Sequence, residues 1–514
     1  MLTPPSSCDT TSRGPRPFAG NRRLPALACG LLLALAAGCS RPDAVKTDPA
    51  EPWPSDVKLR LLVVGDPAIA AALELLQGEW NAQTGSSFSV EQAEKLDLAG
   101  ARPPEADAII LPSYDVGALA ERKWTVPLPK RLIEDRPTFQ LGNQAKEATL
   151  GNWVGIFSLL RGREAAWGSE IVAVPLGSAA LVCYYRADLL DRLGASPPKT
   201  WTDYHKLASL LADRGRLGKD APPPNAPWYG ALEPLGPGWA GLDLLARAAC
   251  YASHRSNYST LFNVDTMEPL IDGPPFVRAM RELVAVAQSG PPEQLRYDPA
   301  AVRRAFWQGQ CALALTWPTA AEKISPPDGG ELRVGFVELP GSSEAYNVSS
   351  RTWDRRTAEE AISVPLLSIA GRMGVVSSGS PSGSQAVAFR LLLWLSDDPR
   401  NRQVCVTSPA TTLFRQSDLN SPGAWVERPV SASAAAQYAE LTRKSLSGQA
   451  SLFALRIPGR GAYLRSLDEA VHLAVKGEKT PEEALKSAAQ KWADTTRKRG
   501  LEPQRTAYQH SLGL

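Results

Sequence analysis

The sequence predicts an α/β fold with a largely parallel sheet, because buried strands alternate with capped helices along the chain. The run LRLLVVGD at 59–66 is almost continuously apolar, as in a strand that is buried on both faces. It ends in Asp66-Pro67, an N-cap residue followed by a proline suited to the first helical turn. A second buried strand, DAIILPSYD at 107–115, precedes the short helical pattern VGALAERK. Such alternation is typical of sheets that are covered by helices on both faces.

The later segments continue this alternation. Residues 171–194 are predicted to form a strand, a Pro-Leu-Gly break, a second strand and a helix. Apolar spacing and capping residues predict further helices, which begin near 202, 241, 276, 299, 384, 466 and 481. Further strands are predicted within 311–318, 330–340 and 363–378. Weak periodicity predicts an inserted, partly helical surface segment at 130–170, a loop at 349–362 and a loose polar tail at 497–514.

The first 40 residues carry the three parts of an export signal. Arg22 and Arg23 precede the apolar run LPALACGLLLALAAG, and small residues lead up to Cys39. The run is about 15 residues long, too short to span a bilayer core of ~30 Å. We therefore expect 1–38 to be a signal peptide and 39–56, rich in proline and charge, to be a flexible tether.

The sequence Leu-Ala-Ala-Gly before Cys39 resembles a bacterial lipobox, in which the cysteine is lipidated and becomes the new N-terminus. Ordinary signal cleavage, with Cys39 incidental, is the alternative. Under either interpretation we expect the chain to work outside the cytoplasm, on the periplasmic side of the cell envelope.

Composition and motifs exclude several classes of function. The net charge of +3 equals that of residues 1–38, so the remainder is near neutral and lacks the basic excess that nucleic-acid binding needs. No HExxH, GxSxG or GxxxxGK[ST] motif occurs, and the four histidines are scattered. We therefore expect no metal, no cofactor, no catalytic residues and no nucleic-acid partner.

The cysteine content does not indicate a disulfide-rich fold. Four cysteines besides Cys39 follow the leader, too few for a disulfide scaffold. A Cys250–Cys311 bridge and buried free thiols both remain open.

The 14 tryptophans are unusually many, and several fall outside helical stripes. That excess favours a site that stacks flat ligands such as sugars.

Several strings occur in an order that resembles a known family. They are the opening strand with Asp66, DAIILPSYD with LAERKWTVPL, VPLGSAALVCYYRADLL with PPKTW, AAVRRAFWQGQCALALTWPTA, and FALRIPGRGAYLRSLDEAVHLAVKGEKTPEEALKSAA. Together they resemble the maltose-binding-protein-like (family 1) solute-binding proteins of bacterial ABC importers. The resemblance covers most of 57–496, with apparent insertions at 130–170 and 341–362. Ser178 or Ala179 stands where maltose binders often carry an acidic residue, which puts maltose itself in doubt.

The resemblance implies a two-lobed periplasmic-binding-protein fold of type II. Each lobe is discontinuous, strands cross between the lobes, and ligand lies in the cleft. The implied N-terminal lobe is 57–176 with 375–412, and the implied C-terminal lobe is 177–374 with 413–496. Gly177 and Gly371 would lie at the hinge, where a large backbone change needs little steric resistance.

A sugar offers hydroxyl groups and an apolar C–H face, so its site needs carboxylates or amides and flat aromatic rings. Asp66 and Asp115 follow buried strands and would emerge at the carboxyl edge of the sheet, where open α/β sheets bind ligands. For Asp66, helix capping is a sufficient alternative role. The other candidate ligand-binding residues are Tyr114, Gly177, Ser178, Trp239, Trp317, Arg372, Arg460 and Tyr463.

The resemblance implies that the chain is a monomeric, lipid-anchored binding protein, not an enzyme. It would capture a mono- or oligosaccharide by hinge closure and deliver it to a membrane permease driven by a cytoplasmic ATPase. One alternative is an envelope lipoprotein that presents ligand to a membrane sensor. Another is a polysaccharide-acting enzyme, since paired carboxylates for glycoside hydrolysis have no fixed sequence spacing.

Overall fold

The structure is a computed structural model that describes residues 55–134, 138–141, 144–149, 152–218, 221–324, 332–355 and 361–514. The predicted signal peptide, Cys39 and most of the predicted tether lie outside these residues. In the described ranges, no helix combines the length and the apolar character needed to cross a membrane.

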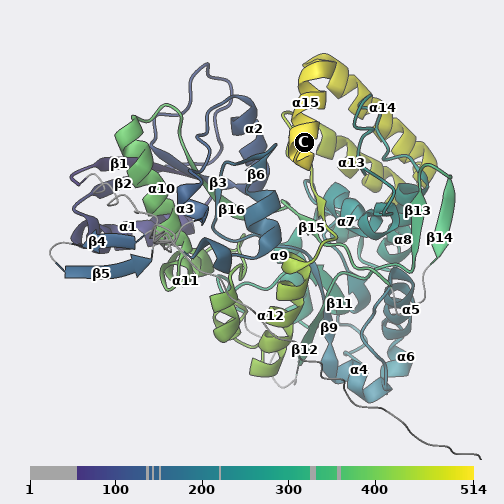
Figure 1. Cartoon of the computed structure of the whole chain (residues 1–514). Helices are drawn as coiled ribbons and strands as arrows, with labels where there is room; N and C mark the ends of the chain where they lie inside the picture. The colour runs from purple at the N-terminus through teal and green to yellow at the C-terminus, as the bar shows by residue number, and fades with distance from the viewer. Residues whose placement is uncertain are drawn as a thin grey trace, which may run out of the picture. The chain divides into compact units, whose positions relative to one another are not determined.

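The described chain has two halves, each of which combines segments that are distant in sequence. The half that contains the N-terminal strands, called the first half, is built on a five-stranded sheet (Figure 1). In sheet order, its strands are β2 (Ser87–Ala93), β1 (Lys58–Val64), β3 (Ala108–Pro112), β16 (Arg372–Val376) and β8 (Val174–Pro175). β1 runs parallel to β2 and β3, whereas β16 runs antiparallel to β3 and β8. Every residue of β3 and β16 is buried, as expected for central strands covered on both faces.

Helices from distant parts of the sequence complete this half. They are α1 (Pro67–Thr84), α2 (Val116–Glu121), α3 (Arg131–Glu134), α10 (Ser382–Ser396) and α11 (Arg400–Val404). α1 begins where predicted, because the Asp66 side chain accepts a hydrogen bond from the Ile69 amide. Trp80 of α1 meets Trp394 of α10 edge to face, with 5.3 Å between ring centroids. The green α10 therefore shares a core with the purple N-terminal elements (Figure 1).

The second half is built on a four-stranded sheet in the order β10 (Tyr229–Leu232), β11 (Cys311–Thr316), β9 (Val182–Arg186) and β12 (Val334–Val337). β10 and β11 are parallel, and β9 is antiparallel to β11 and β12. Its helices are α4 (Ala187–Leu193), α5 (Trp201–Ala212), α6 (Arg214–Leu217), α7 (Ala240–Ala252), α8 (Pro274–Ala287), α9 (Pro299–Trp307), α12 (Ala432–Ser447), α13 (Arg460–Val475) and α14 (Pro481–Arg499). Thr200 and Thr480 form capping boxes that fix where α5 and α14 begin.

Small two-stranded units occupy the segments that resembled insertions. They are β4 (Thr138–Leu141) with β5 (Gln144–Thr149), β6 (Ala166–Trp167) with β7 (Glu170–Ile171), and β13 (Glu344–Asn347) with β14 (Thr352–Arg355). The prediction of a loop at 349–362 was therefore wrong for its first part, where β14 pairs with β13. The surface segment predicted at 130–170 was also wrong in part, because Trp153, Phe157 and Trp167 are buried. These side chains lie in short turns and strands, so the sequence has no periodic apolar pattern that would predict their burial.

Three segments of the described chain pass between the two halves. The first joins β8 to β9, and the second leads from β12 through β15 (Leu366–Leu367) into β16. The third follows α11 and leads to α12, which packs on β12. β15 in turn pairs with β17 (Leu452–Phe453). β16 joins the first sheet from Arg372 onward, whereas the implied N-terminal lobe resumes at residue 375.

The first two crossings touch each other at two glycines. Gly177 and Gly371 have φ angles of +106° and +98°, in the region that L side chains avoid. The amide of Arg372 donates to the carbonyl oxygen of Gly177 at 2.8 Å. A Cβ atom on Gly371 would lie 2.8 Å from that same oxygen. Both positions therefore require glycine for its conformation and its lack of a side chain.

A buried carboxyl group also joins these two crossings. Ser178 and Ser368 both donate their hydroxyl protons to Oε1 of Glu164, at 2.9 and 2.8 Å. Burial raises the pKa of Glu164, and the serine hydroxyls partly oppose that rise. Glu164 therefore fixes the two segments relative to each other.

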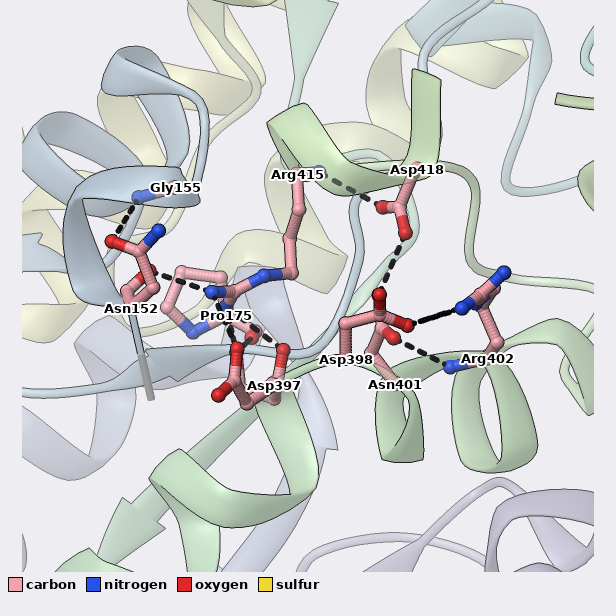
Figure 2. A network of polar contacts seen from close by, with 10 residues as sticks. Asn152, Gly155, Pro175, Asp397, Asp398, Asn401, Arg402, Arg415 and Asp418 are labelled. Carbon is pink, nitrogen blue, oxygen red and sulfur yellow. Dashed lines mark hydrogen bonds and ion pairs between the residues drawn. The ribbon is translucent and has the colours of Figure 1, made fainter. Parts of the chain in front are cut away.

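The third crossing is anchored by the network around Arg415 (Figure 2). The buried guanidinium donates to the carbonyl oxygens of Ser396 (2.8 Å) and Asn152 (2.6 Å) and pairs with Asp397 (3.0 Å). Asp418 accepts from the amides of Phe414 and Arg415 and from the side chain of Asn401. A Cβ atom on Gly155 would lie 3.3 Å from the guanidinium, so a side chain at this position would crowd Arg415. The network ties the crossing to the end of α10.

The C-terminal tail was predicted to be loose, and this prediction was wrong. α14 continues to Arg499, and a further helix, α15 (Leu501–Leu512), follows Gly500. The buried Tyr508 hydroxyl accepts from the amides of Leu261 and Phe262 and shares a hydrogen bond with Ser259 at 2.6 Å. α15 buries only a narrow strip of side chains, which explains why its sequence resembled a polar tail.

Deleting residues 501–514 is expected to lower the free energy of unfolding by about 3–5 kcal/mol, the usual cost of losing one large buried aromatic side chain. The loss of Tyr508 would uncover Phe262, whose ring centroid lies 5.2 Å away. Urea denaturation of the two proteins measures the difference. Deleting only Gly513 and Leu514 is the control, since the Leu514 side chain is half exposed. Equal stability of all three chains would contradict the packing role of α15.

The possible Cys250–Cys311 bridge is absent from the structure. Both thiols are free and buried, as are those of Cys183 and Cys405. Burial raises the pKa of the Cys250 thiol to about 12, which keeps it protonated and unreactive at neutral pH.

Candidate functional site

A cavity of about 250 Å³ is lined by residues from both halves. The first half contributes Tyr114, two residues after the end of β3, and Arg372, the first residue of β16. The second half contributes Trp239, directly before α7, and Trp317, directly after β11. Four of the predicted ligand-binding residues thus lie around one space. The rest of its lining is Asp298, Pro299, Ala300, Arg303, Ile369, Ala370, Pro409 and Ala410.

Trp239 and Trp317 form a pair of indole rings on this wall. Their centroids are 5.5 Å apart, with 47° between the ring planes. Trp317 is buried, and its Nε1 donates to the carbonyl oxygen of Pro409 at 2.9 Å. Trp239 is only half buried and packs against the edge of the hydrophobic core. The pair offers apolar faces to a ligand in the cavity.

The backbone that carries Trp239 is held from α13. The Asp468 carboxylate accepts hydrogen bonds from the amides of Gly238 (2.7 Å) and Gly241 (2.8 Å), on either side of Trp239. Burial raises the pKa of Asp468, and these amides oppose that rise. Asp468 is therefore a positioning residue for the Trp239 ring.

Trp317 is held in a similar way by Arg303 of α9. The guanidinium donates to the carbonyl oxygen of Trp317 at 2.9 Å and lies within ion-pair distance of Glu322 and Glu427. Burial raises the pKa of Glu427 to about 7, and Arg303 opposes that rise. The Arg303 network thus fixes the end of β11 at the cavity.

Tyr114 and Asp115 meet Arg460 beside the cavity. The Arg460 guanidinium lies 3.9 Å from the centroid of the Tyr114 ring, a cation–π contact between the two halves. Burial raises the pKa of Asp115 to about 6, although Arg460 and Arg372 both favour the ionised form. Burial also lowers the pKa of Arg460. Asp115 and Arg460 therefore carry opposite charges close to Tyr114, although neither of them belongs to the cavity lining.

Asp115 keeps its acceptors available. Among the described residues, no donor lies within hydrogen-bond distance of its carboxylate, although two arginines influence its pKa. A partly buried carboxylate without hydrogen bonds is costly.

Asp66 differs from Asp115, because its carboxylate oxygens accept hydrogen bonds from, or pair with, other residues of the fold. It caps α1, pairs with Arg372 at 2.9 Å and accepts a hydrogen bond from the Ser408 hydroxyl at 2.5 Å. Arg372 also donates to the carbonyl oxygen of Gly65 at 2.9 Å. Asp66 therefore orients Arg372 toward its place in the cavity lining and has little capacity left for a ligand.

Six of the predicted ligand-binding residues lie outside the cavity lining: Asp66, Asp115, Gly177, Ser178, Arg460 and Tyr463. Gly177 and Ser178 belong to the first crossing, where Ser178 is bonded to Glu164. Tyr463 is fully buried in α13, and its hydroxyl bonds to Thr496 and Gln504. The predicted helix began at Ser466, whereas α13 begins at Arg460. The earlier start places Tyr463 on the inner face of the helix and not in an exposed turn.

Sequence reasoning missed Asp298 and Arg303 as lining residues. Asp298 was recognised as the cap of α9, and its side chain accepts from the Ala301 amide at 2.7 Å. The start of α9 lies at the cavity, a fact that depends on the packing of α9 against β11. The Asp-Pro signal alone could not distinguish a cap at a site from a cap elsewhere.

The family model described as "Bacterial extracellular solute-binding protein" matches residues 78–364, more than half of the chain. This chain belongs to that family. The prediction of a non-enzymatic solute-binding protein is thereby confirmed, and a family of extracellular proteins implies export.

Solved structures of solute-binding proteins share the fold. An ABC-transporter solute-binding protein from Agrobacterium radiobacter, in complex with ribitol, is 18% identical over 86% of this chain and 98% of its own, with a TM-score of 0.59. Maltose-bound MalE3 of T. maritima is 16% identical over 85% and 99%, with a TM-score of 0.59. A solute-binding protein from Agrobacterium vitis with bound D-mannitol is 16% identical over 86% and 99%, with a TM-score of 0.59. The predicted two-lobed type II fold is confirmed for this solute-binding protein.

Proposed function

We propose that this solute-binding protein captures a carbohydrate or polyol in the cavity lined by Tyr114, Trp239, Trp317 and Arg372. The observation that carries the proposal is the tilted pair of indole rings, Trp239 and Trp317, that lines this cavity together with Tyr114. The next residue after Tyr114 is Asp115, a carboxylate for which no hydrogen-bond donor is found among the described residues. Indole faces suit the C–H surface of a sugar, and the carboxylate suits its hydroxyl groups. The similar proteins with bound ribitol, maltose and D-mannitol support this ligand class.

Capture is proposed to proceed by closure of the two halves about the crossings. The implied lobes are 57–176 with 375–412, and 177–374 with 413–496. Gly177 and Gly371 supply conformations that absorb backbone rotation. Because lining residues come from both halves, a ligand bridging them favours the closed state and shifts the population toward it.

Isothermal titration calorimetry tests the ligand class. The exported protein without its signal segment is titrated with a panel of polyols, monosaccharides, disaccharides and oligosaccharides. Saturable binding of at least one is expected, with an affinity in the micromolar range or tighter. Absence of binding across the whole panel would contradict carbohydrate capture.

The pKa of Asp115 predicts how binding depends on pH. Because the ionised carboxylate would accept ligand hydroxyls, affinity should be greatest above pH 6. It should fall as the pH drops below about 6, approaching a tenfold loss per pH unit. Asp115→Asn should remove this dependence and weaken binding at pH 7.5 by about tenfold or more. Calorimetry between pH 4.5 and 8 measures both effects.

The control for that series is Asp494→Asn, which changes an exposed carboxylate of α14 that pairs with Arg497. Its pH profile should match that of the unmodified protein. A profile for Asp115→Asn that still falls below pH 6 would assign the titration to another group.

The partners follow from the proposed role in an ABC importer. The ligand-loaded protein would deliver its cargo to a membrane permease whose ATPase works in the cytoplasm. The chain would act as a monomer, held at the periplasmic face of the envelope by acyl chains on Cys39.

Cys39→Ser is expected to move the protein from the membrane fraction to the soluble fraction, because two acyl chains are needed for stable anchoring. Fractionation with a labelled fatty acid measures both location and modification. Cys183→Ser is the control, since this buried thiol should have no part in anchoring. Label that persists on Cys39→Ser would contradict lipidation at this residue.

A further inference from the structure

A second cavity, of about 300 Å³, lies at the opposite end of α7 from Trp239. It is lined by the loop after α7 (253–261), the segment 449–456 and part of α15. α7 has 13 residues and is therefore about 20 Å long. The two cavities share no lining residue. The second cavity is thus a separate space, large enough for a small molecule.

Its charged lining is positive. Arg163, Arg255 and Arg456 line it, and none of its described lining residues is aspartate or glutamate. His254 also lines it, but its Nδ1 accepts from the Ser256 amide and its Nε2 contacts Asp354 at 2.8 Å. Both ring nitrogens of His254 are therefore engaged, and the three arginine side chains supply the positive charge of the lining.

Arg456 is buried without a carboxylate partner among the described residues. Its guanidinium donates to the carbonyl oxygens of Glu164 (2.7 Å) and Ser511 (3.1 Å), which are neutral acceptors. Burial lowers the pKa of Arg456 to about 10, yet this value still leaves it charged at neutral pH. The nearby Glu164 carboxyl group favours the charged form of Arg456 but forms no ion pair with it among the described contacts. A buried charge without a contacting anion is unfavourable.

Arg163 and Arg255 stand on the exposed side of the same cavity. Neither forms an ion pair with a described residue; Arg163 lies 6.0 Å from the ring of Phe453. Their guanidinium groups therefore retain their donors. Forked guanidinium donors match the oxygens of phosphate, sulfate and carboxylate groups.

We propose that this second cavity binds a small molecule through an oxyanion group, a phosphate, sulfate or carboxylate, held by Arg163, Arg255 and Arg456. The anion would compensate the buried charge of Arg456, and the exposed arginines would complete its coordination. Serine hydroxyls in the lining, such as Ser253 and Ser451, would supply further donors.

Calorimetry of the exported protein with inorganic phosphate, sulfate and succinate, at constant ionic strength in chloride, tests the site. Saturable binding of at least one anion is expected. The tightest of the three identifies the preferred group. Arg163→Gln combined with Arg255→Gln, both exposed positions that should not disturb folding, should weaken binding about tenfold to a hundredfold. Arg351→Gln, an exposed arginine outside the lining, should have no effect.

Anomalous scattering from crystals soaked in selenate locates the anion directly. A peak within hydrogen-bond distance of the Arg456 guanidinium is expected, and Arg456→Gln should abolish it. Binding that survives the double variant, or a selenate peak elsewhere only, would overturn the proposal. These measurements need no sugar, so they stand even if the carbohydrate panel gives no binding.

Discussion

Replacing Trp239 by alanine is expected to weaken carbohydrate binding by about tenfold to a hundredfold, or roughly 1.4–2.8 kcal/mol. The ring lies in the cavity lining, 5.5 Å from Trp317 between centroids, and is only half buried. Its loss should therefore remove an aromatic face from the cavity lining. Calorimetry gives the affinity, and thermal unfolding checks that the variant is folded. Trp239→Phe should retain part of the binding, since it keeps an aromatic face.

Trp353→Ala is the matched control. This tryptophan is also half buried, but it lies in β14 and packs against Tyr251 and Tyr346, outside the cavity lining. It should leave affinity unchanged. If Trp239→Ala and Trp353→Ala behaved alike, the indole pair would not be the ligand platform.

Replacing Gly371 by alanine is expected to lower the free energy of unfolding by about 2–4 kcal/mol. The residue has φ of +98°, and an added Cβ would lie 2.8 Å from both the carbonyl oxygen of Gly177 and the Cα of Ser178. Conformational strain and collision with rigid backbone therefore add together. Urea denaturation measures the loss.

Gly477→Ala separates these two causes. Gly477 also has positive φ, +72°, but a Cβ there would meet nothing within 4 Å. Its expected cost is the conformational part alone, about 1–2 kcal/mol. An equal cost at both positions would show that the close approach of the two crossings is not needed for stability.

The structure brings together several predicted residues that interrupt a regular sequence pattern. Trp239 and Trp317 stand at the ends of elements, outside helical stripes, and both line the cavity. Tyr114 and Asp115 follow a buried strand and lie at or beside it. A large side chain at the end of an element is not part of a periodic buried stripe, so a binding site is one explanation for its presence there.

Elsewhere, the decisive information was in tertiary packing. Asp66 follows a strand just as Asp115 does, yet Arg372 and Ser408 engage it fully. Both partners come from segments more than 300 residues away in the sequence. Tyr508 shows the same limit, since its hydroxyl is buried by a loop that precedes it by about 250 residues. No local pattern reports such contacts.

A crystal structure of the exported protein with a ligand identified by the calorimetric panel tests the central claim most directly. The account predicts that the ligand lies between the halves, with a ring or carbon chain against Trp239 or Trp317 and a hydroxyl group bonded to Asp115. A ligand bound elsewhere, with the cavity beside Tyr114 and Arg372 empty, would contradict it.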